Sequence, residues 1–175
     1  MNKYWKSAEV VVSRLWREKD RSYSKMSAYR VISPWYIVGL VDGEGCFCIL
    51  ITKHQTKRLR KDAKLCFEIE LRADDRPILE LVQKRLNCGY LLHLDYRRYG
   101  WKPHVKFHVT KQSDIFYKVI PFFKQFPLPG KKGKDFELFC QAAELFKQKK
   151  HLTEEGINQL MKIREFMNER RPMLE

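Results

Sequence analysis

The apolar residues of the chain recur at two different spacings, which predict strands in some segments and helices in others. Residues 65–71 alternate apolar with charged or small polar side chains, and this period of two is typical of a half-buried strand. Residues 46–53 form a nearly continuous apolar run, which predicts a strand that is apolar on both faces. Residues 90–96 and 101–110 predict a second hairpin, whose return strand alternates again.

Spacings of three and four residues predict helices in several other segments, most of which begin near a residue that can cap a helix. The predicted helices run from Asp74 or Asp75 to Asn87, from Ser113 or Asp114 to Pro127, from residue 135 to 149, and from Thr153 to Glu169.

Residues 34–45 predict one more helix, which is apolar and buried. Ser33 is a favourable N-cap, and Pro34 is a favourable first residue because its missing N–H would have had no partner there. Gly39 and Gly43 are four residues apart, so they lie on one helical face without side chains. A second helix can therefore approach this face closely.

The end of this helix carries two carboxylates, those of Asp42 and Glu44. Carboxylates at a helix C-terminus oppose the helix dipole unless a cation is present to offset them. We therefore expect a metal ion at this tip. Gly43 and Gly45 suit a helix end at which the backbone needs a positive φ.

The order of elements is helix, two strands, helix, two strands and then further helices, which predicts an α+β fold. We expect an N-terminal basic extension over residues 1–32, a core domain over 33–150, and a C-terminal helix within 151–175. The extension is rich in basic and aromatic residues, whereas the core carries the regular apolar spacing.

The composition indicates a globular protein that binds a polyanion. The 175 residues are 44% apolar and carry a formal charge of +14, which favours nucleic acid as the partner. No long apolar stretch, secretory segment or lipidation motif is present, so we expect an intracellular protein without a membrane partner. Five cysteines without a Cys-x-x-Cys pair give little support for a disulfide framework or a structural zinc site.

The stretch Ile37-Val-Gly-Leu-Val-Asp-Gly-Glu-Gly45 resembles the LAGLIDADG motif of homing endonucleases. It matches the glycines and both acidic positions of that motif, with Glu44 where Asp is commoner. The resemblance implies an αββαββα core over about residues 33–149, with a saddle of four antiparallel strands. It also implies an intron-encoded, sequence-specific DNA endonuclease of a bacterial cytoplasm, a mitochondrion or a chloroplast.

The resemblance implies roles for the acidic tip. Glu44 would be the carboxylate ligand of a hard divalent cation, Mg²⁺, and the carbonyl of Gly43 would add an oxygen. Such a metal polarises the scissile phosphate and activates water in phosphodiester hydrolysis across the minor groove. Asp42 is a further candidate catalytic residue, although at this motif position a structural role at the helix junction is favoured.

A lysine near the metal is also implied, since the family uses one in the loop before the penultimate core helix. Lys131 matches this position best, and Lys132 is the alternate; a solvated loop lysine or a phosphate contact is the competing interpretation. Leu71 stands where many relatives carry a polar residue, which departs from the family pattern.

The chain contains one copy of the motif, so two active sites require two chains. The resemblance implies a homodimer in which the motif helices pack side by side and each subunit reads half of a pseudo-palindromic site in double-stranded DNA. The predicted interface consists of Trp35, Val38, Gly39 and Gly43.

The outward faces of the strands and the basic loop at residues 53–64 would contact DNA, because a two-stranded ribbon can enter the major groove. An ordinary solvated sheet face is the competing interpretation. The predicted contact residues are Lys53, Gln55, Lys57, Arg58, Arg60, Lys64, Glu68, Glu70, Arg72, His93, Arg97, Arg98, His104, Lys106, His108 and Lys132.

Three other functions compete with the nuclease. A maturase of the same fold would bind intron RNA without cleavage, but it would not need Glu44. A regulatory DNA-binding protein of the same fold would be expected to lack the acidic tip. A zinc protein would use His104, His108 and Cys88, but two histidines four apart in a strand need not converge.

Overall fold

The computed structural model of the protein describes residues 31–56 and 59–167. All the helices and strands discussed below belong to one compact unit that begins at Ile32. The predicted extension over residues 1–32 lies almost wholly outside the described residues, and the predicted domain boundaries stay predictions. Among the described helices, none is long and apolar enough to cross a membrane.

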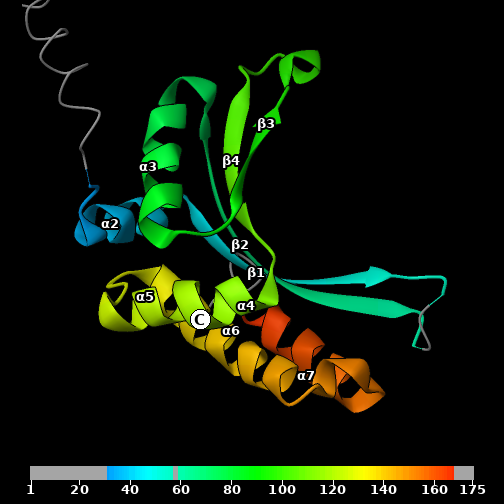
Figure 1. Ribbon diagram of the computed structural model, residues 1–175. Helices are drawn as coiled ribbons and strands as arrows, with labels where there is room; N and C mark the ends of the chain where they lie inside the picture. The colour runs from blue at the N-terminus through cyan, green and yellow to red at the C-terminus, as the bar shows by residue number, and fades with distance from the viewer. Residues whose placement is uncertain (1–30, 57–58, 168–175) are drawn as a thin grey trace, which may run out of the picture. The chain divides into compact units, whose positions relative to one another are not determined.

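The first six main elements repeat a helix followed by a hairpin (Figure 1). They are α2 (Pro34–Glu44), β1 (Gly45–Lys53), β2 (Lys61–Arg72), α3 (Arg76–Leu86), β3 (Tyr90–Leu94) and β4 (His104–Val109). The strands form one antiparallel sheet in the order β1-β2-β4-β3. This confirms the predicted α+β fold and its four-stranded sheet.

Helices follow the sheet in the second part of the unit. They are α4 (Gln112–Asp114), a π-helical turn (Ile115–Val119), α5 (Ile120–Gln125), α6 (Lys131–Lys147) and α7 (Glu154–Glu165). Helix α6 contacts both β1 and β2, and α7 packs on α6. The predicted Thr153 cap is present, because its hydroxyl oxygen accepts the N–H of Gly156 at 3.1 Å.

Aromatic side chains fill the space between the sheet and the helices. Phe47 of β1 stacks on Phe67 of β2 with ring centroids 5.0 Å apart, and both rings meet Phe123 of α5 at 5.5 Å. Phe139 of α6 closes the cluster at 5.3 Å from Phe47. These side chains are buried, so the strand alternation read from the sequence correctly identifies the core face.

The two hairpins differ from their predicted bounds. Strand β2 begins at Lys61 rather than near residue 64, because Lys53 still pairs with Lys61 in the β1–β2 ladder. Backbone pairing continues through charged residues once the register is set, so the basic loop is shorter than predicted. Strands β3 and β4 are shorter than predicted, and a 3₁₀ turn over Arg97–Tyr99 lies between them.

The helices after β4 also depart from the prediction. The N-cap position of α4 is occupied by Lys111, so neither Ser113 nor Asp114 starts the helix. The π-helical turn leads into α5, whose second residue is Pro121; the missing N–H and the ring of this proline interrupt the regular hydrogen-bond ladder. Helix α6 starts at Lys131 instead of residue 135, directly after an extended Gly130.

Candidate active site and nucleic-acid interface

Helix α2 ends at Glu44, and β1 starts at the next residue. Glu44 is exposed, whereas Gly45 is buried and donates its N–H to the carbonyl of Val41. Gly45 has φ −78°, so the expected positive φ is wrong. The position needs glycine for another reason: a Cβ there would lie 2.5 Å from Val41 Cγ1 and 2.6 Å from its carbonyl oxygen. This close approach fixes Glu44 at the turn between helix and strand.

The carboxylate of Asp42 lies at a different place from that of Glu44. A Cβ on Gly130, the N-cap of α6, would be 2.6 Å from Asp42 Cγ. Oδ1 of Asp42 is buried and has no hydrogen-bond partner among the described residues. A carboxylate beside a helix N-terminus is stabilised by the helix dipole. The geometry therefore favours the structural role for Asp42, in which it joins α2 to α6.

The two candidate lysines occupy the first turn of α6, immediately after Gly130. Lys131 is exposed and Lys132 is half-buried. Because Asp42 touches Gly130, the start of α6 lies against the end of α2. The fold thus brings the predicted lysines and the acidic tip to one corner, although the lysines belong to a helix and not to a loop.

One face of α2 is open. A Cβ at Gly39 or Gly43 would meet nothing within 4 Å, and the Trp35 side chain is 59% exposed. Tyr36 is also exposed, at 50%. Val38 does not share this face: with Ile37 and Val41 it forms the inward stripe of the helix and is buried in the core.

The centre of the outward sheet face is internally paired. Lys106 Nζ lies 2.9 Å from Glu68 Oε2 and 3.2 Å from Glu70 Oε2. Burial acts to raise the pKa of Glu68, but hydrogen bonds from Cys66 and Lys106 outweigh it, and the pKa is lowered. Burial likewise acts to lower the pKa of Lys106, but both carboxylates outweigh it. These three predicted DNA contacts therefore already have partners.

Other predicted contact residues lie at the ends of the sheet, in the β1–β2 hairpin and near the β3–β4 turn (Figure 1). Arg72 pairs with Asp74 and Arg97 with Asp95, each at 2.6 Å. Lys57 and Arg58 lie outside the described residues. The exposed members of the described set are Lys53, Gln55, Arg60, Lys64, Arg72, His93, Arg97 and Arg98.

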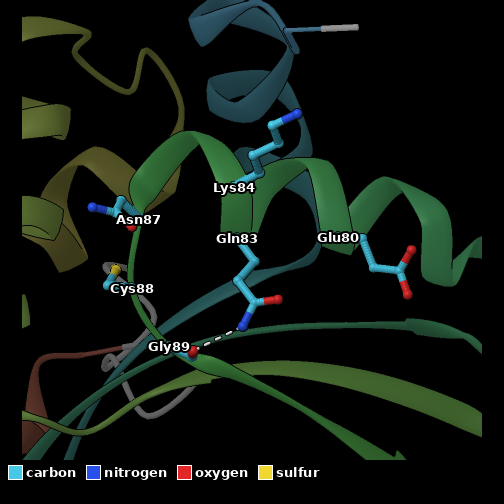
Figure 2. A pocket seen from close by; sticks show the side chains of 6 residues that line it. All are labelled: Glu80, Gln83, Lys84, Asn87, Cys88 and Gly89. Atoms are coloured by element: carbon cyan, nitrogen blue, oxygen red, sulfur yellow. Dashed lines mark hydrogen bonds between the residues drawn. The ribbon is translucent and has the colours of Figure 1, made fainter. Parts of the chain in front are cut away.

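The residues of the competing zinc interpretation, His104, His108 and Cys88, do not form a metal-binding group in the structure. His104 Nδ1 contacts the carbonyl of Lys102, whereas Nε2 of His108 lies 2.9 Å from Cys66 Sγ. Cys88 follows α3 and lines a pocket of about 340 Å³ there (Figure 2). That pocket contains none of the predicted catalytic residues. Figure 2 shows Gln83 pointing to Gly89, whose carbonyl accepts its amide at 2.9 Å.

Sequence reasoning missed a thiol cluster on the outward face of the sheet. Cys48 of β1 lies opposite Cys66 of β2, and the Sγ atoms of Cys46 and Cys48 lie 3.2 Å apart. Cys66 and Glu68 are two residues apart in an alternating strand, so the sequence already indicated that they share the outward face. The missing information was the register, which pairs Cys48 with Cys66 and Cys46 with Glu68.

The chain contains two helix–hairpin units in succession, and its first helix carries two unobstructed glycines and ends in an exposed carboxylate. These features place it in the class of LAGLIDADG proteins. The sequence profile of the family described as LAGLIDADG endonuclease matches residues 37–143, and the chain belongs to this family. A probable intron-encoded endonuclease of Neurospora crassa is 32% identical over 164 residues. The aligned region covers 94% of this chain and 30% of that relative.

Solved structures agree with this assignment. The I-LtrWI LAGLIDADG homing endonuclease, bound to target DNA, superposes with a TM-score of 0.75 at 30% identity, over 82% of this chain and 47% of that one. The homing endonuclease I-TnaI superposes with a TM-score of 0.71 at 28% identity, over 79% of this chain and 90% of that one. The chain thus spans less than a third of the curated relative and about half of I-LtrWI.

Proposed function

We propose that the protein is a homing endonuclease that cuts a specific site in double-stranded DNA by metal-dependent phosphodiester hydrolysis. The observation that carries this proposal is the exposed Glu44 at the end of the motif helix. Retention of this carboxylate is unexpected for a protein that only binds DNA or RNA. Its relatives' names, which describe intron-encoded endonucleases, support the same activity.

The residues at the tip of α2 fit a hard cation such as Mg²⁺. Glu44 offers a carboxylate and Gly43 a main-chain carbonyl at a helix C-terminus, where the partial negative charge favours a cation. When bound, the metal supplies a Lewis acid that polarises the phosphate and lowers the pKa of water. Lys131 adds a compact positive charge beside the phosphate, with Lys132 as the alternate. Asp42 holds α2 against α6, which keeps the carboxylate and the lysines together.

The open face of α2 supports a two-fold dimer. Gly39 and Gly43 leave room for the same helix of a second copy, and the exposed Trp35 would lie beside it. I-LtrWI, of which this chain matches about half, has the length expected for two such units in one chain. Two copies would place two acidic tips together, so that each cuts one strand of a pseudo-palindromic site.

The exposed basic residues of the hairpins would hold the DNA. I-LtrWI was solved with its target DNA, which supports a DNA partner for the homologous surface here. Exposed side chains such as Lys53, Arg60 and Lys64 can reach phosphates and base edges without breaking an internal contact between β2 and β4. We also propose that the protein acts in an organelle, because one relative is described as a protein in ND4 intron 1 of Podospora anserina.

The decisive experiment incubates the 175-residue chain with a pool of duplexes that span intron insertion sites, in Mg²⁺ or in Ca²⁺. We expect double-strand cutting with Mg²⁺ only. Glu44→Gln should abolish cutting and leave DNA affinity within a few-fold, because the exposed side chain contributes nothing to the core. Glu80→Gln is the matched control, since Glu80 is also an exposed glutamate but belongs to α3 and not to the tip of α2.

Two results would contradict the proposal. Cutting by Glu44→Gln at the parent rate would remove the carboxylate from the chemistry. Binding to intron RNA by the folded parent, without cutting of any duplex in the pool, would establish the maturase function instead.

A further inference from the structure

Three of the five cysteines converge on the outward face of the sheet, and none of the three belongs to the main hydrophobic cluster on the other face. Cys46 and Cys48 alternate with the buried Phe47 on β1, and Cys66 lies opposite Cys48 on β2. Cys46 Sγ is 3.2 Å from Cys48 Sγ. Among the described residues none of these three cysteines forms a disulfide, nor does Cys88 or Cys140 elsewhere in the fold.

An imidazole and a carboxylate complete this cluster. Cys66 Sγ lies 2.9 Å from His108 Nε2 and 3.0 Å from Glu68 Oε1. The ligand atoms of Cys48, Cys66 and Glu68 all lie within 4.8 Å of one another. In a tetrahedral zinc site with bonds of about 2.0–2.3 Å, ligand atoms stand about 3.3–3.8 Å apart. Small rotations of these three side chains would therefore bring them around one ion, and the contact of His108 with Cys66 makes its imidazole the fourth candidate ligand.

We propose that Cys48, Cys66, Glu68 and His108 bind one soft divalent cation of the zinc class. Thiolate and imidazole ligands select zinc over Mg²⁺, which prefers oxygen ligands. Cys46 contacts Cys48 but lies outside this ligand set. Each coordinating cysteine binds as a thiolate and gives its proton to the solvent.

The charge balance of the cluster favours this ion. Release of two thiol protons and uptake of one divalent cation leaves the net charge of the half-buried site unchanged. Glu68 faces the cluster with Oε1 and keeps Oε2 on Lys106, so the lysine retains a partner. Glu70 also pairs with Lys106, and the positive charge of Lys132 acts on Cys46.

Such a site would connect three strands. Cys48 belongs to β1, Cys66 and Glu68 to β2, and His108 to β4. The ion would therefore fix the curvature of the outward face independently of the acidic tip, which uses a different class of metal. This inference rests on the cluster alone and holds whether or not the protein cuts DNA.

The test is a Co²⁺ titration of the reduced, metal-free 175-residue chain in excess Mg²⁺, so that oxygen-rich sites are already filled. Co²⁺ reports its ligands through a near-ultraviolet thiolate charge-transfer band and through strong visible bands in tetrahedral geometry. We expect both to saturate at one equivalent and to disappear when one equivalent of Zn²⁺ is added. Zn²⁺ should also raise the melting temperature.

Two matched double variants assign the ligands. Cys88→Ser/Cys140→Ser should retain both signals, because it removes only the cysteines outside the cluster. Cys48→Ala/Cys66→Ala should lose them while its far-ultraviolet circular dichroism shows a folded chain. His108→Gln should weaken Co²⁺ binding at least about tenfold. No thiolate band in the parent, or an unchanged band in folded Cys48→Ala/Cys66→Ala, would overturn the proposal.

Discussion

Two glycines of the motif serve opposite purposes. Gly45 has no room for a Cβ because Val41 lies against it, and this contact sets the turn from α2 into β1. Gly39 has open space around it, so its missing side chain does nothing for the packing of the described protomer. Gly45 is therefore required for folding, whereas Gly39 is required only for the approach of a partner that packs on α2.

Alanine substitutions should separate these two roles. Gly45→Ala should lower the free energy of unfolding by about 1–3 kcal/mol, because the added methyl overlaps Val41. Gly39→Ala should raise it by about 0.5–1 kcal/mol through its helix propensity, yet weaken self-association. Urea denaturation at low protein concentration and analytical ultracentrifugation would measure the two effects. Destabilisation by Gly39→Ala would contradict the open face.

At the scale of elements, the outward face of β2 and β4 depends on one lysine. Lys106 stands between Glu68 and Glu70, and all three side chains are only 19–31% exposed. Two carboxylates can lie this close because the ammonium group between them attracts both and offsets part of their mutual repulsion. The strand pairing in this part of the sheet is therefore coupled to ionisation.

Lys106→Met should destabilise the fold in a pH-dependent way. Because the folded pKa of Glu68 is lowered, the interaction stabilises the protein above the ordinary glutamate pKa and is lost as the pH falls through the folded value. We expect a loss of about 1–3 kcal/mol at pH 7 that shrinks near pH 4. Urea denaturation in EDTA measures it, with the exposed Lys84→Met as control. An equal loss at both pH values would refute the coupling.

The sequence predicted the elements better than their contacts. The alternation of apolar residues identified the core face of β2, and the motif identified the tip carrying Glu44. The start of α6 was missed because Gly130 and the lysines after it read as a loop, and only the packing of Asp42 against Gly130 shows where the helix begins. The thiol cluster was missed because it depends on register between strands.

The whole chain has a formal charge of +14, and no lysine or arginine among the described residues is buried. The centre of the outward sheet face carries no excess of positive charge, because Lys106 pairs there with two glutamates. DNA would therefore meet positive charge chiefly on the hairpins. Contacts of this kind release counterions from DNA, which makes the affinity depend on salt. The net charge alone could not show this distribution.

DNA affinity should therefore fall steeply with salt. For roughly six to ten phosphate contacts, we expect a loss of about a thousandfold or more between 50 and 200 mM salt. Fluorescence anisotropy in Ca²⁺ would measure it without cleavage. Lys53→Ala, which removes an exposed hairpin charge, should reduce the slope of log affinity against log salt by about one. An affinity that hardly changes with salt would argue against phosphate contacts.

The alternation of the strands has a consequence for how such a protein diverges. In β4 the residues of the core face alternate with those of the outward face, so no residue serves both faces. The core face consists of Val105, Phe107 and Val109, and the outward face of His104, Lys106 and His108. Selection can therefore act on the two sets separately. New target preferences can arise at little cost to folding where the outward side chain is exposed, whereas Lys106, which pairs with Glu68 and Glu70, is a costly position to change. A library randomised only at exposed outward positions should accordingly consist mostly of folded proteins, which makes this sheet a practical starting point for engineered specificity.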